Sequence, residues 1–228
     1  MDAPTPDAEL ELGKLIDRGV IMQEMLSKAW QLFDSGAIDT AEALYLDCYG
    51  QVSVSNHEIY TSVLMGLIYV ESSMKKYDEA RKYAELLVRI ADNDEDRHVA
   101  IHQYGMVERM AGNFSKSKIL FQQEAELIRA AFSDDDLRIS ANYYEQAYVE
   151  MKMGNLNFAE ETMTLALEYA IKAKDSICIG CACRGMGEIV KVRSNSEQAK
   201  LWFDKAIDAF GDAGDLIAVE EVRNLARI

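Results

Sequence analysis

Two histidines, His98 and His102, are the first residues whose type and spacing suggest chemistry. They stand four positions apart, a spacing at which a helix presents both side chains on one face. Such a pair supplies two zinc ligands when a third group completes the site. No glutamate follows His98 directly and no third ligand is evident in the sequence, so we expect no zinc site here.

An acidic run that opens with Asp92, Asp94 and Asp96 resembles the start of a calcium loop. An EF-hand loop needs glycine at its sixth position and a bidentate carboxylate at its twelfth. This chain has Arg97 and Gln103 at those positions. We therefore expect the acidic residues to begin a helix, where capping and the helix dipole favour them.

Three cysteines, Cys178, Cys181 and Cys183, form a C-x2-C-x-C pattern. A redox CxxC site needs a helix N-terminus beside a βαβ unit. The run 177–186 instead predicts the interior of a helix, with Cys183 at a buried small-residue position. We expect reduced, packed thiols.

Three glycines, Gly180, Gly185 and Gly187, lie close together in the same run. Glu188 follows them where a phosphate-binding P-loop carries lysine and serine or threonine. Tight helix packing is the expected role of these glycines. With three histidines in the whole chain and no nucleophile, base or metal constellation, we expect no enzyme activity, no catalytic residue, no metal and no cofactor.

Composition limits the classes of partner. A formal net charge of −15 opposes binding to a phosphate backbone, because that affinity comes largely from Lys and Arg. No apolar stretch approaches the roughly 20 residues that a membrane-spanning helix needs. The two prolines, Pro4 and Pro6, precede everything else, so helix can follow helix. We expect an all-α cytoplasmic protein that binds neither nucleic acid nor membrane.

The helical region repeats one pattern. Each copy has a helical run, a turn that often carries glycine, an apolar residue, a small residue three positions later and, in most copies, a large apolar residue four positions after that. The first copy shows this as Gly36, Ile38, Ala41 and Tyr45. Corresponding small residues recur roughly every 40 residues. They are Ala41, Ala80, Ser117, Ala159 and Ala199.

This pattern resembles the tetratricopeptide repeat (TPR), in which small residues let two antiparallel helices pack closely. The long period is similar to that of a subset containing bacterial peptide-responsive regulators and kinesin-light-chain-like scaffolds. The resemblance implies a right-handed α-α superhelix, a TPR-like solenoid of about five helix pairs plus a C-terminal capping helix. We expect a disordered tail over 1–8 and a single solenoid domain over 9–228. The predicted pairs span about 20–51, 56–92, 95–131, 135–173 and 176–210, and the cap spans 215–227.

The resemblance also implies a binding surface, a concave groove lined by the first helix of each pair. Carried over position by position, it implies a partner-binding role for Gln23, Trp30, Phe33, Tyr60, His102, Arg109, Tyr144, Tyr148, Lys152, Arg184 and Lys191. The alternative for Trp30, Phe33 and Tyr148 is a place in the core. Three glutamates, Glu71, Glu145 and Glu188, map to the same surface, which weakens the case for a carboxylate ligand.

The function implied is that of a module binding a protein or peptide. Two finer alternatives stay open. One is a peptide-responsive regulator of the quorum-sensing type that lacks its effector domain, and the other is a TPR-type secretion chaperone. Two roles stay open for Trp202: it covers the final helix, or it meets a second subunit in a homodimer through the C-terminal repeat.

Overall fold

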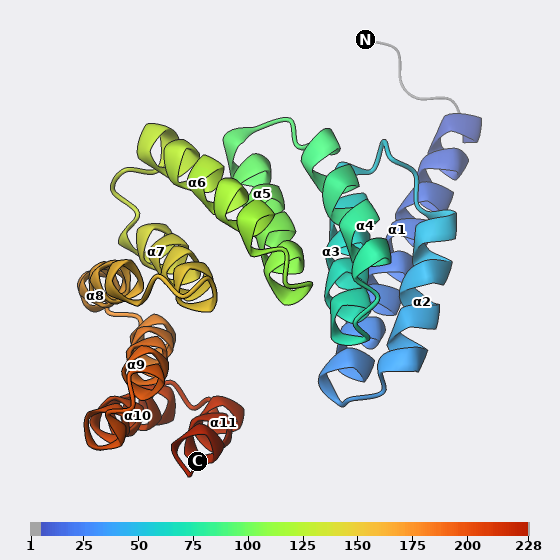
Figure 1. The fold of residues 1–228 in the computed structure, drawn as a ribbon. Coiled ribbons are helices and arrows are strands. Elements are labelled where there is room, and N and C mark those ends of the chain that lie inside the picture. Colours follow the sequence, from blue (N-terminus) through green and yellow to red (C-terminus); the bar gives the residue numbers. More distant parts are fainter. Residues whose placement is uncertain (1–5, 228) are drawn as a thin grey trace. The chain divides into compact units, whose positions relative to one another are not determined.

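Helices account for all the regular structure in the computed structural model, which describes residues 6–227 (Figure 1). They are α1 (Pro6–Asp34), α2 (Ile38–Gln51), α3 (His57–Ser73), α4 (Tyr77–Ile90), α5 (Asp94–Met110), α6 (Phe114–Ala131), α7 (Asp136–Lys152), α8 (Leu156–Ala173), α9 (Ser176–Val192), α10 (Ser196–Asp212) and α11 (Leu216–Ala226). The predicted all-α class is confirmed. None of these helices is long and apolar enough to cross a membrane.

The predicted helix pairs agree with the observed helices to within about two residues, except at the N-terminus. There, α1 begins at Pro6 rather than near residue 20. Residues 1–5 of the predicted disordered tail lie outside the described residues, and residues 6–8 are helical.

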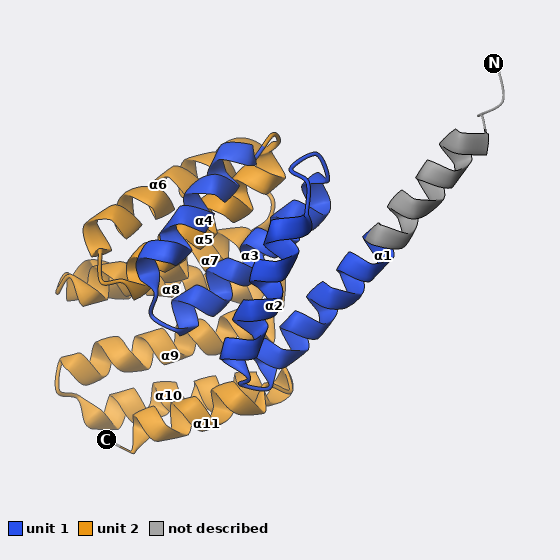
Figure 2. Cartoon of the chain, turned by 90° about the vertical axis from the view of Figure 1, so that its right-hand side faces the viewer, with its two compact units in different colours: residues 1–91 blue, residues 92–228 orange. Residues whose placement is uncertain are grey.

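The chain forms two compact units, unit 1 over residues 1–91 and unit 2 over residues 92–228 (Figure 2). Unit 1 contains α1 to α4, and unit 2 contains α5 to α11. A single domain over 9–228 remains a prediction.

The turn inside each pair has one residue with positive φ. Gly36, Gly112 and Gly154 take this position in three pairs, with φ near +80°. In the pairs whose turns lack glycine, Lys75 (φ 60°) and Ser194 (φ 62°) take the same left-handed conformation. The backbone geometry of the repeat is therefore kept even where the residue that adopts it most easily is absent.

Large side chains of second helices pack directly against glycines of first helices. A Cβ built on Gly187 would lie 2.6 Å from the Phe203 ring, and one on Gly185 would lie 2.3 Å from Met163. The Phe210 ring packs against Gly180 in the same way. The predicted packing role of these glycines is confirmed.

The acidic runs and the cysteines also take their predicted places. The side chain of Asn93 caps α5 and that of Asp135 caps α7, each accepting a backbone N–H three residues later. Cys183 is buried, and all four cysteines are free thiols.

Candidate functional site

In unit 1, the predicted binding residues divide into exposed and buried positions. Trp30 is 48% exposed and forms an aromatic cluster with Phe33 and Tyr69, with ring centroids 5.5 to 6.5 Å apart. The sequence did not single out Tyr69. Tyr60 was expected on an open surface, but it is 6% exposed because it stacks on Tyr49 inside the core.

The remaining unit 1 position, Gln23, lies exposed on α1.

Burial, together with a hydrogen bond to Tyr49, raises the pKa of Tyr60 to about 12. Tyr60 is therefore a core residue, and a surface role for it is wrong.

In unit 2, most of the predicted residues come together on three first helices. We call this surface the α5–α7–α9 face, defined by Arg109, Tyr144, Glu145, Tyr148, Lys152, Arg184 and Glu188. Within α7, positions 144, 145, 148 and 152 share one side of the helix, as a period of 3.6 residues requires.

Arg109 of α5 joins α7 through charge and ring contacts. Its Nε lies 2.9 Å from Oε2 of Glu145, and its guanidinium carbon lies 4.6 Å from the centroid of the Tyr148 ring. Neither Nε nor Oε2 is aligned for a hydrogen bond, so the pair attracts as charges only. Burial raises the pKa of Glu145, and the charges of Arg109 and His102 oppose that rise only in part.

Arg184 of α9 joins the same face from the other side of α7. It donates a 2.8 Å hydrogen bond to the Tyr144 hydroxyl. Its ion pairs with Glu188 and Glu221 are loose, at 3.9 Å and 3.7 Å. Because those distances are long, the guanidinium keeps capacity for another acceptor.

Glu188 lies among several cations. Burial raises its pKa, while Arg184, Lys152, Arg109 and Lys191 act in the opposite direction. Lys152 is exposed, and its ammonium lies 4.8 Å from the centroid of the Tyr148 ring. The face therefore combines clustered positive charge with tyrosine rings inside a strongly acidic chain.

Lys191 has a different role from the one expected. Its ammonium donates a 2.7 Å hydrogen bond to the backbone carbonyl of Leu225, in the last turn of α11. Lysine commonly satisfies carbonyl groups at a helix C-terminus in this way. Lys191 thus holds the final helix against α9.

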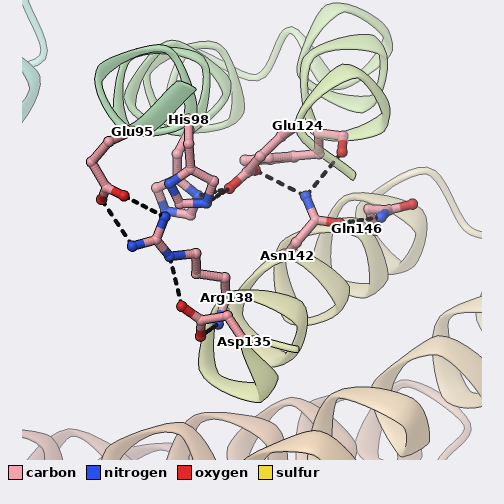
Figure 3. Close-up of polar contacts among 9 residues, drawn as sticks. Glu95, His98, Glu124, Asp135, Arg138, Asn142 and Gln146 are labelled. Carbon is pink, nitrogen blue, oxygen red and sulfur yellow. Dashed lines mark hydrogen bonds and ion pairs between the residues drawn. The ribbon is translucent and has the colours of Figure 1, made fainter. Parts of the chain in front are cut away.

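His102 belongs to a polar network around the buried Glu124, and Figure 3 shows His98, Glu124 and Asn142 of this network. Its Nδ1 lies 3.0 Å from Oε1 of Glu124, and His98 Nε2 lies 3.1 Å from the same oxygen. Both histidines therefore contact Glu124 of α6, a partner more than twenty positions away that the sequence did not reveal. Asn142 of α7 donates to the other carboxylate oxygen at 2.9 Å.

The network fixes the charge of Glu124, which is 1% exposed. Burial alone would raise its pKa, but contacts from His102, His98 and Asn142 lower it to about 2. The same contact acts on His102, where burial lowers the pKa and the Glu124 carboxylate more than reverses that, so the pKa is raised.

A second contact between α5 and α7 lies beside this network (Figure 3). Arg138 donates two hydrogen bonds to Glu95, at 2.8 and 2.9 Å, and one nitrogen lies 2.8 Å from Asp135. Its guanidinium also lies over the Phe132 ring. Planar bidentate pairing of this kind fixes geometry as well as adding energy.

Trp202 of α10 is half-buried and packs against the cores that α9 forms with its neighbours. It thus covers part of the interior of unit 2. Leu216 and Ile217 at the start of α11 are far more exposed, at 74% and 73%.

Comparison with solved structures gives the fold. PlcR of Bacillus thuringiensis, in a complex with the peptide PapR7 and DNA, matches with a TM-score of 0.70 and 12% identity, over 88% of this chain and 73% of PlcR. The fold is TPR-like. The apo form of RapI matches with a TM-score of 0.67 and 15% identity, over 85% of this chain and 72% of RapI.

The TPR-like repeats of a putative kinesin light chain from Podospora anserina match with a TM-score of 0.64 and 15% identity, over 85% of this chain and 96% of theirs. The resemblance to TPR-like regulators and kinesin-light-chain repeats is thus confirmed at the level of fold. No family model matches the sequence, and a search of curated proteins finds no match.

Proposed function

We propose that this TPR-like protein is a protein- or peptide-binding module and that the α5–α7–α9 face contacts the ligand. The observation that carries the proposal is the gathering of Arg109, Lys152 and Arg184 around the Tyr144 and Tyr148 rings. Arginine and tyrosine dominate the energetics of protein interfaces, because each combines apolar area with directional polar groups.

Glu145 and Glu188 offset only part of the positive charge, so the chemistry of the face fits a peptide segment that carries a carboxylate beside an apolar side chain. The loosely paired Arg184 and the exposed Lys152 supply the positive charge. The tyrosine rings supply apolar area. The likeness in fold to PlcR, whose structure contains the peptide PapR7, supports a peptide as the ligand. DNA, also present in that complex, is not carried over, because a net charge of −15 opposes it.

The aromatic cluster of unit 1 (Trp30, Phe33 and Tyr69) is proposed as a second contact area, since Trp30 is half-exposed and its ring meets two others. A non-enzymatic role, a cytoplasmic location and self-association near α11 also stay proposals. The exposed Leu216 and Ile217 support self-association.

The test compares two lysines that have the same local chemistry. Lys152 lies over Tyr148 on the proposed face, and Lys172 lies over Tyr169 on α8. Both lysines are exposed, so either charge reversal leaves the core intact. Wild type, Lys152→Glu and Lys172→Glu are immobilised, and bound proteins and peptides from host lysate are identified by mass spectrometry.

Of the two variants, we expect only Lys152→Glu to lose the bound species. Its affinity for a synthetic copy of that species should be about tenfold lower, the effect of one lost charged contact. Recovery of a short free peptide favours a peptide-responsive regulator, and an unfolded segment of a secreted protein favours a chaperone. The same partners bound with the same affinity by all three proteins would remove the α5–α7–α9 face from consideration.

A further inference from the structure

A cavity of about 670 Å³ lies between α6, α7 and α8 of unit 2. Its volume is within the range of roughly 300–1,000 Å³ that small-molecule sites occupy. It is not on the α5–α7–α9 face. Gln146, which lines it, is two positions before Tyr148, and two positions turn an α-helix by about 200°. The cavity is therefore independent of the function proposed above.

The lining combines apolar surface with neutral hydrogen-bonding groups. Tyr143 and Tyr169 form one wall, with ring centroids 5.8 Å apart. Ile128 and Ile139 add aliphatic surface. The amide of Gln122 and the hydroxyl of Ser133 also border the space.

The charges that border the cavity balance. Among the described lining residues, the charged side chains are one glutamate, Glu126, and one arginine, Arg129, both on α6. A cavity whose charges cancel gives no preference for a charged ligand.

The Gln146 amide is held in one orientation by a chain of hydrogen bonds (Figure 3). The Asn142 amide nitrogen donates to the Phe121 carbonyl and to Glu124, both at 2.9 Å. Both partners are acceptors, so they fix which end of the Asn142 amide carries the nitrogen. The Asn142 oxygen therefore lies at the other end, where it needs a donor. Gln146 Nε2 fulfils that need at 2.6 Å.

Because its nitrogen is engaged by Asn142, the Gln146 amide is oriented before any ligand arrives. Its Oε1, turned away from Asn142 in Figure 3, keeps its lone pairs, and Nε2 keeps a second N–H. One acceptor beside one donor is the complement of a carboxamide or a peptide group.

We propose that this cavity binds a neutral ligand through a carboxamide or peptide group, which pairs with Gln146 while an apolar flank of the ligand packs on Tyr143 and Tyr169. A free small amide and an extended stretch of a partner's backbone both offer this chemistry. Pre-orientation of Gln146 reduces the entropy lost on binding.

The experiment uses the full chain with ¹³C-labelled isoleucine δ1 methyl groups, because Ile128 and Ile139 report directly on the cavity. The probes are N-acetyl-tyrosinamide as a free amide, a capped tetrapeptide acetyl-Ala-Tyr-Ala-Ala-amide as a backbone segment, and 3-(4-hydroxyphenyl)propionate as a charged analogue that has no amide. We expect saturable shifts of both methyl signals with the amides and weaker binding of 3-(4-hydroxyphenyl)propionate. Tighter binding of the tetrapeptide than of N-acetyl-tyrosinamide assigns a partner segment, and the reverse assigns a small amide.

Gln146→Leu should raise the Kd of the amide probes about tenfold, as expected for the loss of two neutral hydrogen bonds. If that variant does not fold, Gln122→Leu takes its place, with Gln123→Leu as its matched control. Both glutamines are exposed neighbours on α6, but only Gln122 lines the cavity. Methyl shifts that do not saturate, or equal affinities for wild type and the cavity variants, would overturn the proposal.

Discussion

Replacing Glu124 with glutamine keeps the shape of the side chain and removes its charge. The carboxylate lies within 3.1 Å of nitrogens of both His98 and His102, and it accepts a hydrogen bond from Asn142. A carboxylate accepts on both oxygens, whereas an amide must present its NH2 group to one of these sides. In the variant, the NH2 group faces either the Asn142 amide nitrogen, which is a donor, or the two histidines, whose ring nitrogens must then stop donating, in a site that is 1% exposed.

The magnitude follows from the pKa. The folded protein holds the pKa of Glu124 at about 2, against an ordinary value of 4.5. Each tenfold change in an acidity constant corresponds to about 1.4 kcal/mol, so the fold favours the charged form by about 3 kcal/mol. Removing one partner of a buried charged pair costs about 3–5 kcal/mol in general. We expect Glu124→Gln to lower the free energy of unfolding of unit 2 by about 3 kcal/mol.

The assay uses the two tryptophans, one in each unit. A Trp30→Phe background leaves Trp202 as the single tryptophan, so its fluorescence in urea reports the unfolding of unit 2. Glu126→Gln, on the exposed side of the same helix, is the matched control and should change the free energy of unfolding by less than about 0.5 kcal/mol.

The dependence on pH supplies a further check. A lowered folded pKa gives stability that is fully present above the unfolded value of 4.5 and is lost as the pH falls toward about 2. The difference between wild type and Glu124→Gln should therefore shrink below about pH 4.5. A loss under about 1 kcal/mol at pH 7, or a difference that stays constant down to the acid limit, would refute the role assigned to the buried carboxylate.

Gly187→Ala should destabilise unit 2 by about 1–3 kcal/mol in urea, because its methyl would lie 2.6 Å from an aromatic ring; Gly211→Ala, with nothing within 4 Å, should not. Partial burial raises the pKa of Cys178 to about 12, so iodoacetamide at pH 8 should modify it far more slowly in the folded than in the urea-unfolded chain; equal rates would contradict the raised pKa. The pKa of His102, measured by NMR, should exceed 6.5 and fall in Glu124→Gln. Stability from His102 is present below pH 6.5 and is lost as the pH rises through the folded pKa.

The repeat architecture was readable from the amino-acid sequence because its signals are local. Small residues such as Ala159 and turn residues such as Gly154 recur at a constant spacing, and each acts within a few positions of its own helix. These signals predicted the helix pairs and the glycine contacts. Lys75 and Ser194 show the limit of residue type alone, since both adopt the left-handed turn conformation without being glycine.

The register of the repeat also brought Arg109, Tyr148 and Arg184 to one surface, because positions that correspond in successive first helices face the same way. It did not distinguish Tyr60, which the neighbouring Tyr49 buries, or Lys191, which bonds to α11.

Only the tertiary structure paired His102 with Glu124 and Gln146 with the cavity. These partners come from helices many positions apart, and their burial depends on how neighbouring pairs pack. Helical periodicity determines the direction in which a side chain leaves its own helix. What that side chain meets is decided by the other helices, and burial beside those groups sets its charge and its hydrogen bonds.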